Sequence, residues 1–202
     1  MTPNFLNQLR SQISSPLISM FCKKYEENDA LLKKTIDTSI CTVLIGLNSI
    51  KDNTILYNKV IESITLTEFF NSLEYDNGKL SSINYSFEHE GLVALNLIFS
   101  NKKGRISEMI SNEIGVKSGT AGAVLNFAVM LILSNFKNET DGAVIEENLN
   151  SDKKGLLSII PEGIRIILGY PNFEYEDAHY TADSITKTNL KTHFFNKIFK
   201  QS

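Results

Sequence analysis

Apolar residues at the start of the chain recur at helical spacing. A short amphipathic helix is expected on the face made by Phe5, Leu6, Leu9 and Ile13. It should end near Pro16, which then stands in the first turn of a second helix at 16–25, where a missing N–H costs no hydrogen bond. The spacing therefore predicts two short helices at the entry to the domain.

Two later segments are long, apolar and almost free of charge. Asn28 or Asp29 can cap a helix from Ala30 to about Ser49, and 38–50 carries no charged side chain. The segment 119–136 also lacks charge. Because each helix has more apolar surface than it can hide alone, we expect the two to pack against each other at the centre of one domain.

The middle of the chain is less uniform. A helix is expected over 54–73, followed by the turn Asp76-Asn77-Gly78. Asn-Gly favours a hairpin between alternating apolar strands; these are not clear here, so we predict a loop, with a short strand within 79–90 as the weaker alternative. Helices should resume at 92–99 and from Gly104. A last pair is expected at 156–160 and 161–168, ending at Gly169.

An internal repeat relates the two halves, each with a short helix, a turn and a long uncharged helix. A shift of 88 positions places Ile18 on Ile106, Ile36 on Val124 and Leu44 on Ile132. Identity is slight, so duplication and convergence on a helical hairpin explain it equally well. We predict an all-α, multihelical single domain of about seven or eight helices with two long buried helices at its centre.

The stretch 106–136 begins like a helix-turn-helix and ends almost like a membrane span. A DNA-reading helix needs polar or basic side chains toward bases and phosphates, yet 119–136 offers only Asn126 and Asn135, so no nucleic-acid partner is expected. Thr120 and Ser134 also interrupt the apolar run, and no basic or aromatic flank frames it as in a span. We therefore predict a helix buried in a soluble core.

Composition narrows the class of protein. The 202 residues are 42% hydrophobic and 21% charged, which is typical of a globular domain, and a net charge of −3 argues against broad nucleic-acid binding. The N-terminus lacks a basic region followed by an apolar run, so we expect no signal peptide and a cytoplasmic location. Cys22 and Cys41 are either two buried free thiols, the simpler reading, or a single bridge.

A search for catalytic and metal-binding motifs finds no HExxH, GxSxG, Walker loop or CxxC pair. His89 lies between two glutamates that face away from it on a helix or strand, so no metal cluster is expected. The acidic segment 174–179 is more simply solvated than a divalent-cation site. Arg105 and Arg165 are expected to be surface charges. We therefore predict no enzyme, no catalytic residue, no cofactor and no metal.

Two sequence stretches carry a family likeness. The segments LNLIFSNKKGRISEMISNEIGVKSGTAGAVLNFAVMLIL (95–133) and LLSIIPEGIRIILG (156–169) resemble the YidB-like bacterial proteins, domain of unknown function 937. The likeness rests on Gly104, Gly115-Val116, the long apolar helix and Pro161-Glu162-Gly163, with 14–47 similar to the family's first hairpin. It covers roughly 4–169 and implies an all-helical fold, but no activity, since the family has no established function.

The chain departs from this family in its composition and in its C-terminus. It is poorer in glycine and richer in lysine and asparagine, and 170–202 has no counterpart. We therefore divide the chain into a YidB-like all-helical domain at 1–169 and, at 170–202, a polar linker with an amphipathic C-terminal helix.

The C-terminal segment NLKTHFFNKIFK (189–200) is the strongest functional candidate in the sequence. On a helix, one apolar face would contain Leu190, Phe194, Phe195, Ile198 and Phe199. This face could dock on its own domain, on a protein partner or on a second subunit, and a membrane surface is the least favoured target. The sequence does not fix the oligomeric state.

We therefore expect a non-enzymatic helical interaction or assembly module acting through the tail and helix faces. Two alternatives stay open: a bundle that binds a small molecule or lipid chain in its apolar centre, and an uncharacterised enzyme.

Overall fold

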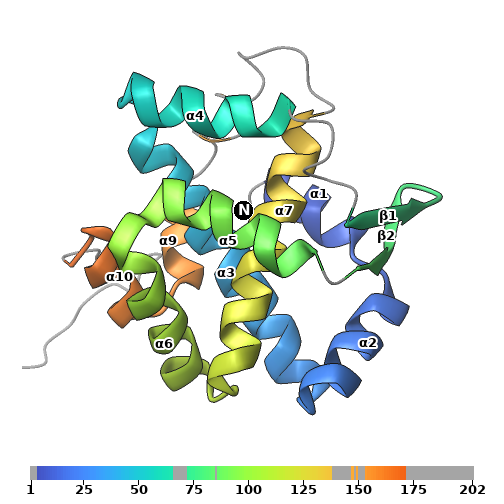
Figure 1. Cartoon of the computed structure of the whole chain (residues 1–202). Helices are drawn as coiled ribbons and strands as arrows, with labels where there is room; N and C mark the ends of the chain where they lie inside the picture. The colour runs from blue at the N-terminus through green and yellow to red at the C-terminus, as the bar shows by residue number, and fades with distance from the viewer. Residues whose placement is uncertain are drawn as a thin grey trace, which may run out of the picture.

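The computed structural model describes residues 4–65, 72–84, 86–137 and 153–171, together with positions 147 and 149. Within these ranges the chain forms a multihelical domain with one small two-stranded sheet at its edge (Figure 1). The predicted all-α, multihelical class is thus confirmed. The tail residues Leu190, Phe194, Phe195, Ile198 and Phe199 lie outside the described residues.

The N-terminal helices begin and end as the sequence predicts. They are α1 (Asn4–Gln12), α2 (Ser15–Tyr25) and α3 (Asp29–Ile50). The Ser14 hydroxyl accepts a hydrogen bond from the Leu17 N–H at the start of α2, and the Asn28 side chain accepts one from the Leu31 N–H at the start of α3. Each cap satisfies a backbone donor that a helix N-terminus leaves free.

The second half repeats this hairpin. After α5 (Phe87–Phe99) and the 3₁₀ turn η2 (Ser100–Lys102), α6 (Lys103–Ile114) is followed by the long α7 (Ser118–Lys137). The short helix of each hairpin ends in a left-handed residue, Glu26 after α2 and Gly115 after α6, and the long helix begins three residues later. The two predicted helical hairpins are therefore present in the fold.

Helices α3 and α7 pack against each other, and α5 packs across α7 (Figure 1). The predicted pairing of the two long helices is confirmed. By length and composition α7 could cross a membrane, yet 83% of its most apolar window is buried within the domain. Of its two side-chain amides, Asn126 is buried and Asn135 exchanges hydrogen bonds with Gln12.

The loop predicted at Asn77-Gly78 is wrong. The strands β1 (Leu73–Asp76) and β2 (Lys79–Ile83) pair antiparallel across this turn, which projects at the right of Figure 1. Asn77 and Gly78 both have positive φ, 48° and 74°, as a two-residue hairpin turn requires. The strands lack apolar alternation because they lie at the edge, where β1 has one buried residue and β2 buries Leu80.

Two predicted helix boundaries also need correction. The helix expected over 54–73 is α4 (Thr54–Thr65), and Leu73 already belongs to β1. The helix expected from Leu92 begins earlier, at Phe87. There the Asn84 side chain accepts a hydrogen bond from the Ser86 N–H, which turns the chain directly from β2 into α5.

The predicted C-terminal helix pair is present as α9 (Lys153–Ile159) and α10 (Glu162–Leu168), which ends at the left-handed Gly169. Helix α9 packs on α3, and α10 packs on α6. The surface position expected for Arg165 is wrong. Its side chain is buried and donates hydrogen bonds to the Leu157 and Ile160 carbonyls, so it ties α10 to the end of α9.

Candidate functional site

A groove opens where the end of α3, the start of α4, the end of α5 and α10 meet. Its volume is about 370 Å³. Leu56, Leu97 and Leu168 come from three different helices and are only partly buried, and Ile50 and Phe99 lie beneath as part of the core. This surface is called the leucine groove below.

Exposed apolar side chains adjoin the leucine groove. Ile55, which precedes Leu56 on α4, is 71% exposed, and Val93 is 42% exposed. Val93 lies four residues before Leu97 on α5, so the two share one stripe of that helix. The apolar surface of the groove therefore continues from Leu97 to Val93 along α5.

The rim of the leucine groove is polar but nearly uncharged. Ser49, Asn96, Ser100 and Asn101 contribute hydroxyl and amide groups. Among the described residues that line the groove, Lys102 carries a charge and the others carry none. Such a surface favours an apolar ligand face and gives it little electrostatic guidance.

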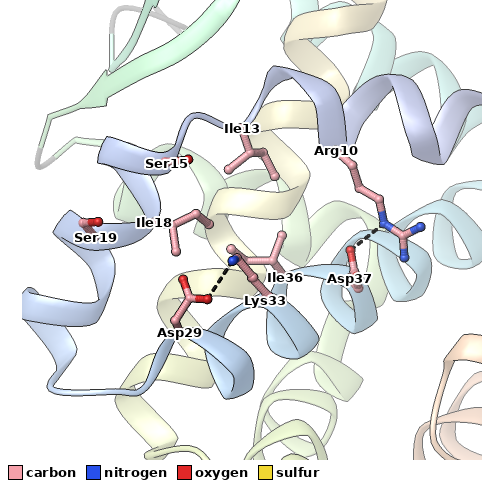
Figure 2. A pocket seen from close by; sticks show the side chains of 9 residues that line it. All are labelled: Arg10, Ile13, Ser15, Ile18, Ser19, Asp29, Lys33, Ile36 and Asp37. Carbon is pink, nitrogen blue, oxygen red and sulfur yellow. Dashed lines mark hydrogen bonds and ion pairs between the residues drawn. The ribbon is translucent and has the colours of Figure 1, made fainter.

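A second hollow, of about 320 Å³, lies between α1, α2 and α3 (Figure 2). Ile13, Ile18 and Ile36 make its apolar wall, and hydroxyls stand on α2 at Ser15 and Ser19. Two ion pairs flank it: Arg10 Nε donates to Asp37 Oδ1 at 2.7 Å, and Lys33 Nζ lies 2.6 Å from Asp29 Oδ2. This surface is called the charged cleft below.

The electrostatics of the charged cleft are those of a solvated pair of salt bridges. Hydrogen bonding to Asp37 raises the pKa of the Arg10 guanidinium further above its ordinary value, even though partial burial opposes it. The Asp29–Lys33 pair is 60% exposed on both sides and follows the ordinary i,i+4 spacing of a helix surface. Opposite charges thus neutralise each other at both ends of the cleft.

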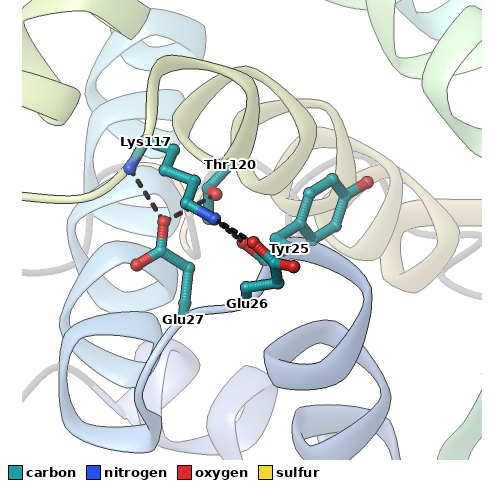
Figure 3. A network of polar contacts seen from close by, with 5 residues as sticks. All are labelled: Tyr25, Glu26, Glu27, Lys117 and Thr120. Atoms are coloured by element: carbon teal, nitrogen blue, oxygen red, sulfur yellow. Dashed lines mark hydrogen bonds and ion pairs between the residues drawn. The ribbon is translucent and has the colours of Figure 1, made fainter.

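The two hairpin turns are joined by a polar network (Figure 3). Glu27 Oε1 accepts hydrogen bonds from the Lys117 N–H and the Thr120 hydroxyl, both at 2.8 Å, at the start of α7. In return Lys117 Nζ donates to the Tyr25 carbonyl and to Glu26. A carboxylate at a helix N-terminus and an ammonium at a helix C-terminus both match the helix dipole, so the network is structural.

A further polar contact joins α2 to α5. Glu88 Oε1 accepts hydrogen bonds from Lys24 Nζ and the Tyr25 hydroxyl at 2.9 and 2.8 Å. Burial by itself would raise the pKa of Glu88, but the two hydrogen bonds outweigh it and hold this pKa below the ordinary value of 4.5. Phe21 and Phe87 pack edge to face beside this contact.

The other described residues singled out by sequence are not brought together into a reactive centre, and the acidic segment 174–179 lies outside the described residues. Among the residues that the structure describes, no group of three or more His, Cys, Asp and Glu side chains could hold a metal ion. His89 is exposed on α5. Cys22 and Cys41 are free thiols, as the simpler expectation had it, although Cys22 is only partly buried. Burial raises the pKa of Cys41 to about 12, which keeps this thiol protonated and unreactive.

The described chain is an all-α multihelical domain with two surface hollows, the leucine groove and the charged cleft. No family model, no curated protein and no solved structure matches this chain. The likeness to YidB-like proteins therefore stays a resemblance carried by the motifs above.

Sequence reasoning missed both the leucine groove and the charged cleft. The groove joins residues from Ser49 to Leu168, which are far apart in the sequence. The cleft forms between the consecutive helices α1, α2 and α3, and its shape depends on how they pack. One clue was available: Val93 and Leu97 form an apolar stripe on α5 in addition to the residues that face the core.

Proposed function

We propose that this chain is a non-enzymatic helical interaction module whose leucine groove binds an amphipathic helix of a protein. The observation that carries the proposal is the continuity of partly buried leucines in the groove with the exposed Val93 on α5. An amphipathic helix inserts side chains at positions i, i+3, i+4 and i+7 into a groove of this kind. The groove provides apolar contacts from three helices for such a stripe.

The filled centre of the domain argues against the first alternative, a lipid chain held between the central helices. Ile40, Leu44, Ala128 and Ile132 on α3 and α7 are 0 or 1% exposed. The groove and the cleft both lie at the edge of this core and are lined by its outer residues. Interaction at the surface is therefore better supported than binding at the centre.

The proposal is tested with a generic probe, a fluorescent peptide of about 12 residues with leucines on one helical face and lysines on the other. The protein is the full chain carrying Phe194→Asp and Ile198→Asp, so that its own tail does not compete. We expect saturable binding of the probe and none of a scrambled peptide with the same composition.

Groove variants locate the binding. Leu97→Gln should weaken the probe's affinity at least tenfold, about 1.4 kcal/mol. Leu97→Met keeps an apolar side chain of similar volume and should leave the affinity nearly unchanged. Urea unfolding of each variant separates loss of binding from loss of fold. Absence of binding, or equal affinity in the two variants, would refute the proposed function.

The charged cleft supports a second candidate function, the binding of a small molecule. Its volume lies at the lower end of the range of ligand sites, which is roughly 300–1,000 Å³. Isoleucines between two ion pairs fit a ligand with an apolar body and both a positive and a negative group. Free apolar amino acids and dipeptides are suitable probes in calorimetry, with Asp37→Asn as the variant that should abolish binding. Absence of measurable heat for the whole panel would remove this candidate.

A further inference from the structure

We infer that the leucine groove is the docking site of the chain's own C-terminal segment, residues 189–200, within the same molecule. This inference rests on the proposed function of the groove and names its occupant. Four features of the chain support it: the position of the groove, the length of the following chain, the effective concentration of a tethered segment and the match of surface chemistry.

The groove lies next to the point where the described chain ends. Leu168 lines it, and the last described residue is Pro171, three positions further on. About 18 residues then separate Pro171 from Leu190, and a chain of that length reaches up to about 60 Å when extended. The tail stripe can therefore reach the groove without any change in the domain.

Tethering favours the chain's own tail over a second copy. A segment joined by a short linker is present at an effective concentration on the order of millimolar, whereas a second molecule competes only at its bulk concentration. A short helix of about 12 residues is marginal alone in water and gains order from a surface that covers its apolar face. Even weak docking in the same molecule therefore fills the groove at micromolar protein concentrations.

The surface chemistry of the two partners matches in apolar character. The tail stripe of Leu190, Phe194 and Ile198, widened by Phe195 and Phe199, meets a groove lined by leucines. On a helix Lys191 lies within the apolar arc at its N-terminal end, whereas Lys197 and Lys200 lie outside it. The groove rim carries Lys102 and no acid among its described lining residues. Docking is therefore driven by apolar burial, and added salt should not release the tail.

The test measures how fast a thiol at the groove is labelled in the full chain. Asn96→Cys places the thiol on the exposed rim, in a Cys22→Ser background, and the buried Cys41 stays unreactive. If the tail occupies the groove about nine-tenths of the time, labelling by a disulfide reagent is slowed about tenfold. Phe194→Asp with Ile198→Asp should restore fast labelling, because it removes the apolar stripe.

Matched controls test which face of the tail docks, where it docks and whether the docked tail belongs to the same molecule. Asn189→Asp with Asn196→Asp adds the same charge to the opposite helical face and should leave labelling slow. A thiol introduced at Ser19, in the charged cleft, should react at the same rate with either tail. Over about a hundredfold range of protein concentration the protection should stay constant, as tethering requires.

Three results would overturn the inference. The first is equal labelling at position 96 with native and Asp-substituted tails. The second is protection at position 19 in place of position 96. The third is protection that grows with protein concentration, which assigns the groove to a second copy. If the generic probe still binds the groove while any of these is found, the proposed function stands and this inference alone fails.

Discussion

At the scale of single residues, Gly91 sets how closely α5 approaches α7. A Cβ atom at this position would lie 2.5 Å from the Asn126 carbonyl oxygen, which belongs to backbone. Since a backbone atom on a buried helix has little room to move, an added methyl group forces the two helices apart. The tightly packed centre of the molecule therefore depends on the absence of a Cβ atom at Gly91 as well as on large apolar side chains.

Gly91→Ala should destabilise the fold by about 1–3 kcal/mol through overpacking, despite the better helix propensity of alanine. The matched control is Gly119→Ala on α7, where an added Cβ meets nothing within 4 Å and a small gain in stability is expected. Urea unfolding measures both. Equal stability of the two variants would show that α5 and α7 are not in tight contact at Gly91.

Glu88 makes the stability of the α2–α5 contact depend on pH. Its pKa is lower in the folded protein than the ordinary 4.5, so the unfolded chain binds more protons in acid. The contribution of this carboxylate is therefore present above about pH 4.5 and is lost as the pH falls through the folded pKa.

Glu88→Gln removes this titration. Between about pH 6 and about pH 3 the free energy of unfolding should fall less steeply in the variant than in the parent. Urea midpoints measured across that range make the comparison between the parent and the variant. Parallel curves for parent and Glu88→Gln would contradict the assignment.

At the scale of elements, the helix ends marked by a cap or stop residue were predictable, whereas the end of α4, the start of α5 and the edge strands were not. Asn28 as a cap and Gly169 as a stop follow from local backbone chemistry, which the sequence contains in full. The β1–β2 hairpin was missed because its strands lack apolar alternation, although Asn77-Gly78 carried the turn chemistry. Arg165 was missed because the carbonyls it satisfies belong to the α9–α10 turn, whose geometry no sequence pattern displays.

The polar network between the two hairpin turns predicts that two adjacent glutamates contribute differently to stability. Glu27 caps α7 through the Lys117 N–H and the Thr120 hydroxyl, so Glu27→Ala should cost about 0.5–2 kcal/mol. Glu26 makes an exposed ion pair with Lys117 Nζ, and such pairs contribute little. Glu26→Gln should therefore leave the thermal midpoint unchanged.

Thermal unfolding of these two variants, monitored by circular dichroism, makes the test. A loss of stability in Glu26→Gln as large as that in Glu27→Ala would show that the ion pair stabilises the two turns as much as the helix cap does. Retained stability in Glu27→Ala would show that α7 begins without this cap.

At the scale of the whole molecule, the sequence repeat predicted the central pair of helices, α3 and α7. It did not predict the leucine groove, which also requires α4, α5 and α10. The groove is formed by the end of α3, the start of α4, the end of α5 and α10, which are brought together by the packing of the whole domain. Sequence periodicity shows which face of a helix is apolar, but two such faces on α5 serve different purposes, one in the core and one at the groove. Only the packed structure distinguishes them.

Docking of the C-terminal segment in the leucine groove is tested most directly by methyl NMR spectra of the full chain with a paramagnetic tag on the tail. The tag is attached at Asn196→Cys, on the polar face of the segment, in the Cys22→Ser background. We expect strong broadening of the methyl signals of Leu56, Leu97 and Leu168, which line the leucine groove, and intact signals from Leu80 in the edge hairpin. Broadening centred on Ile13 and Ile18 in the charged cleft, or no selective broadening at all, would contradict it.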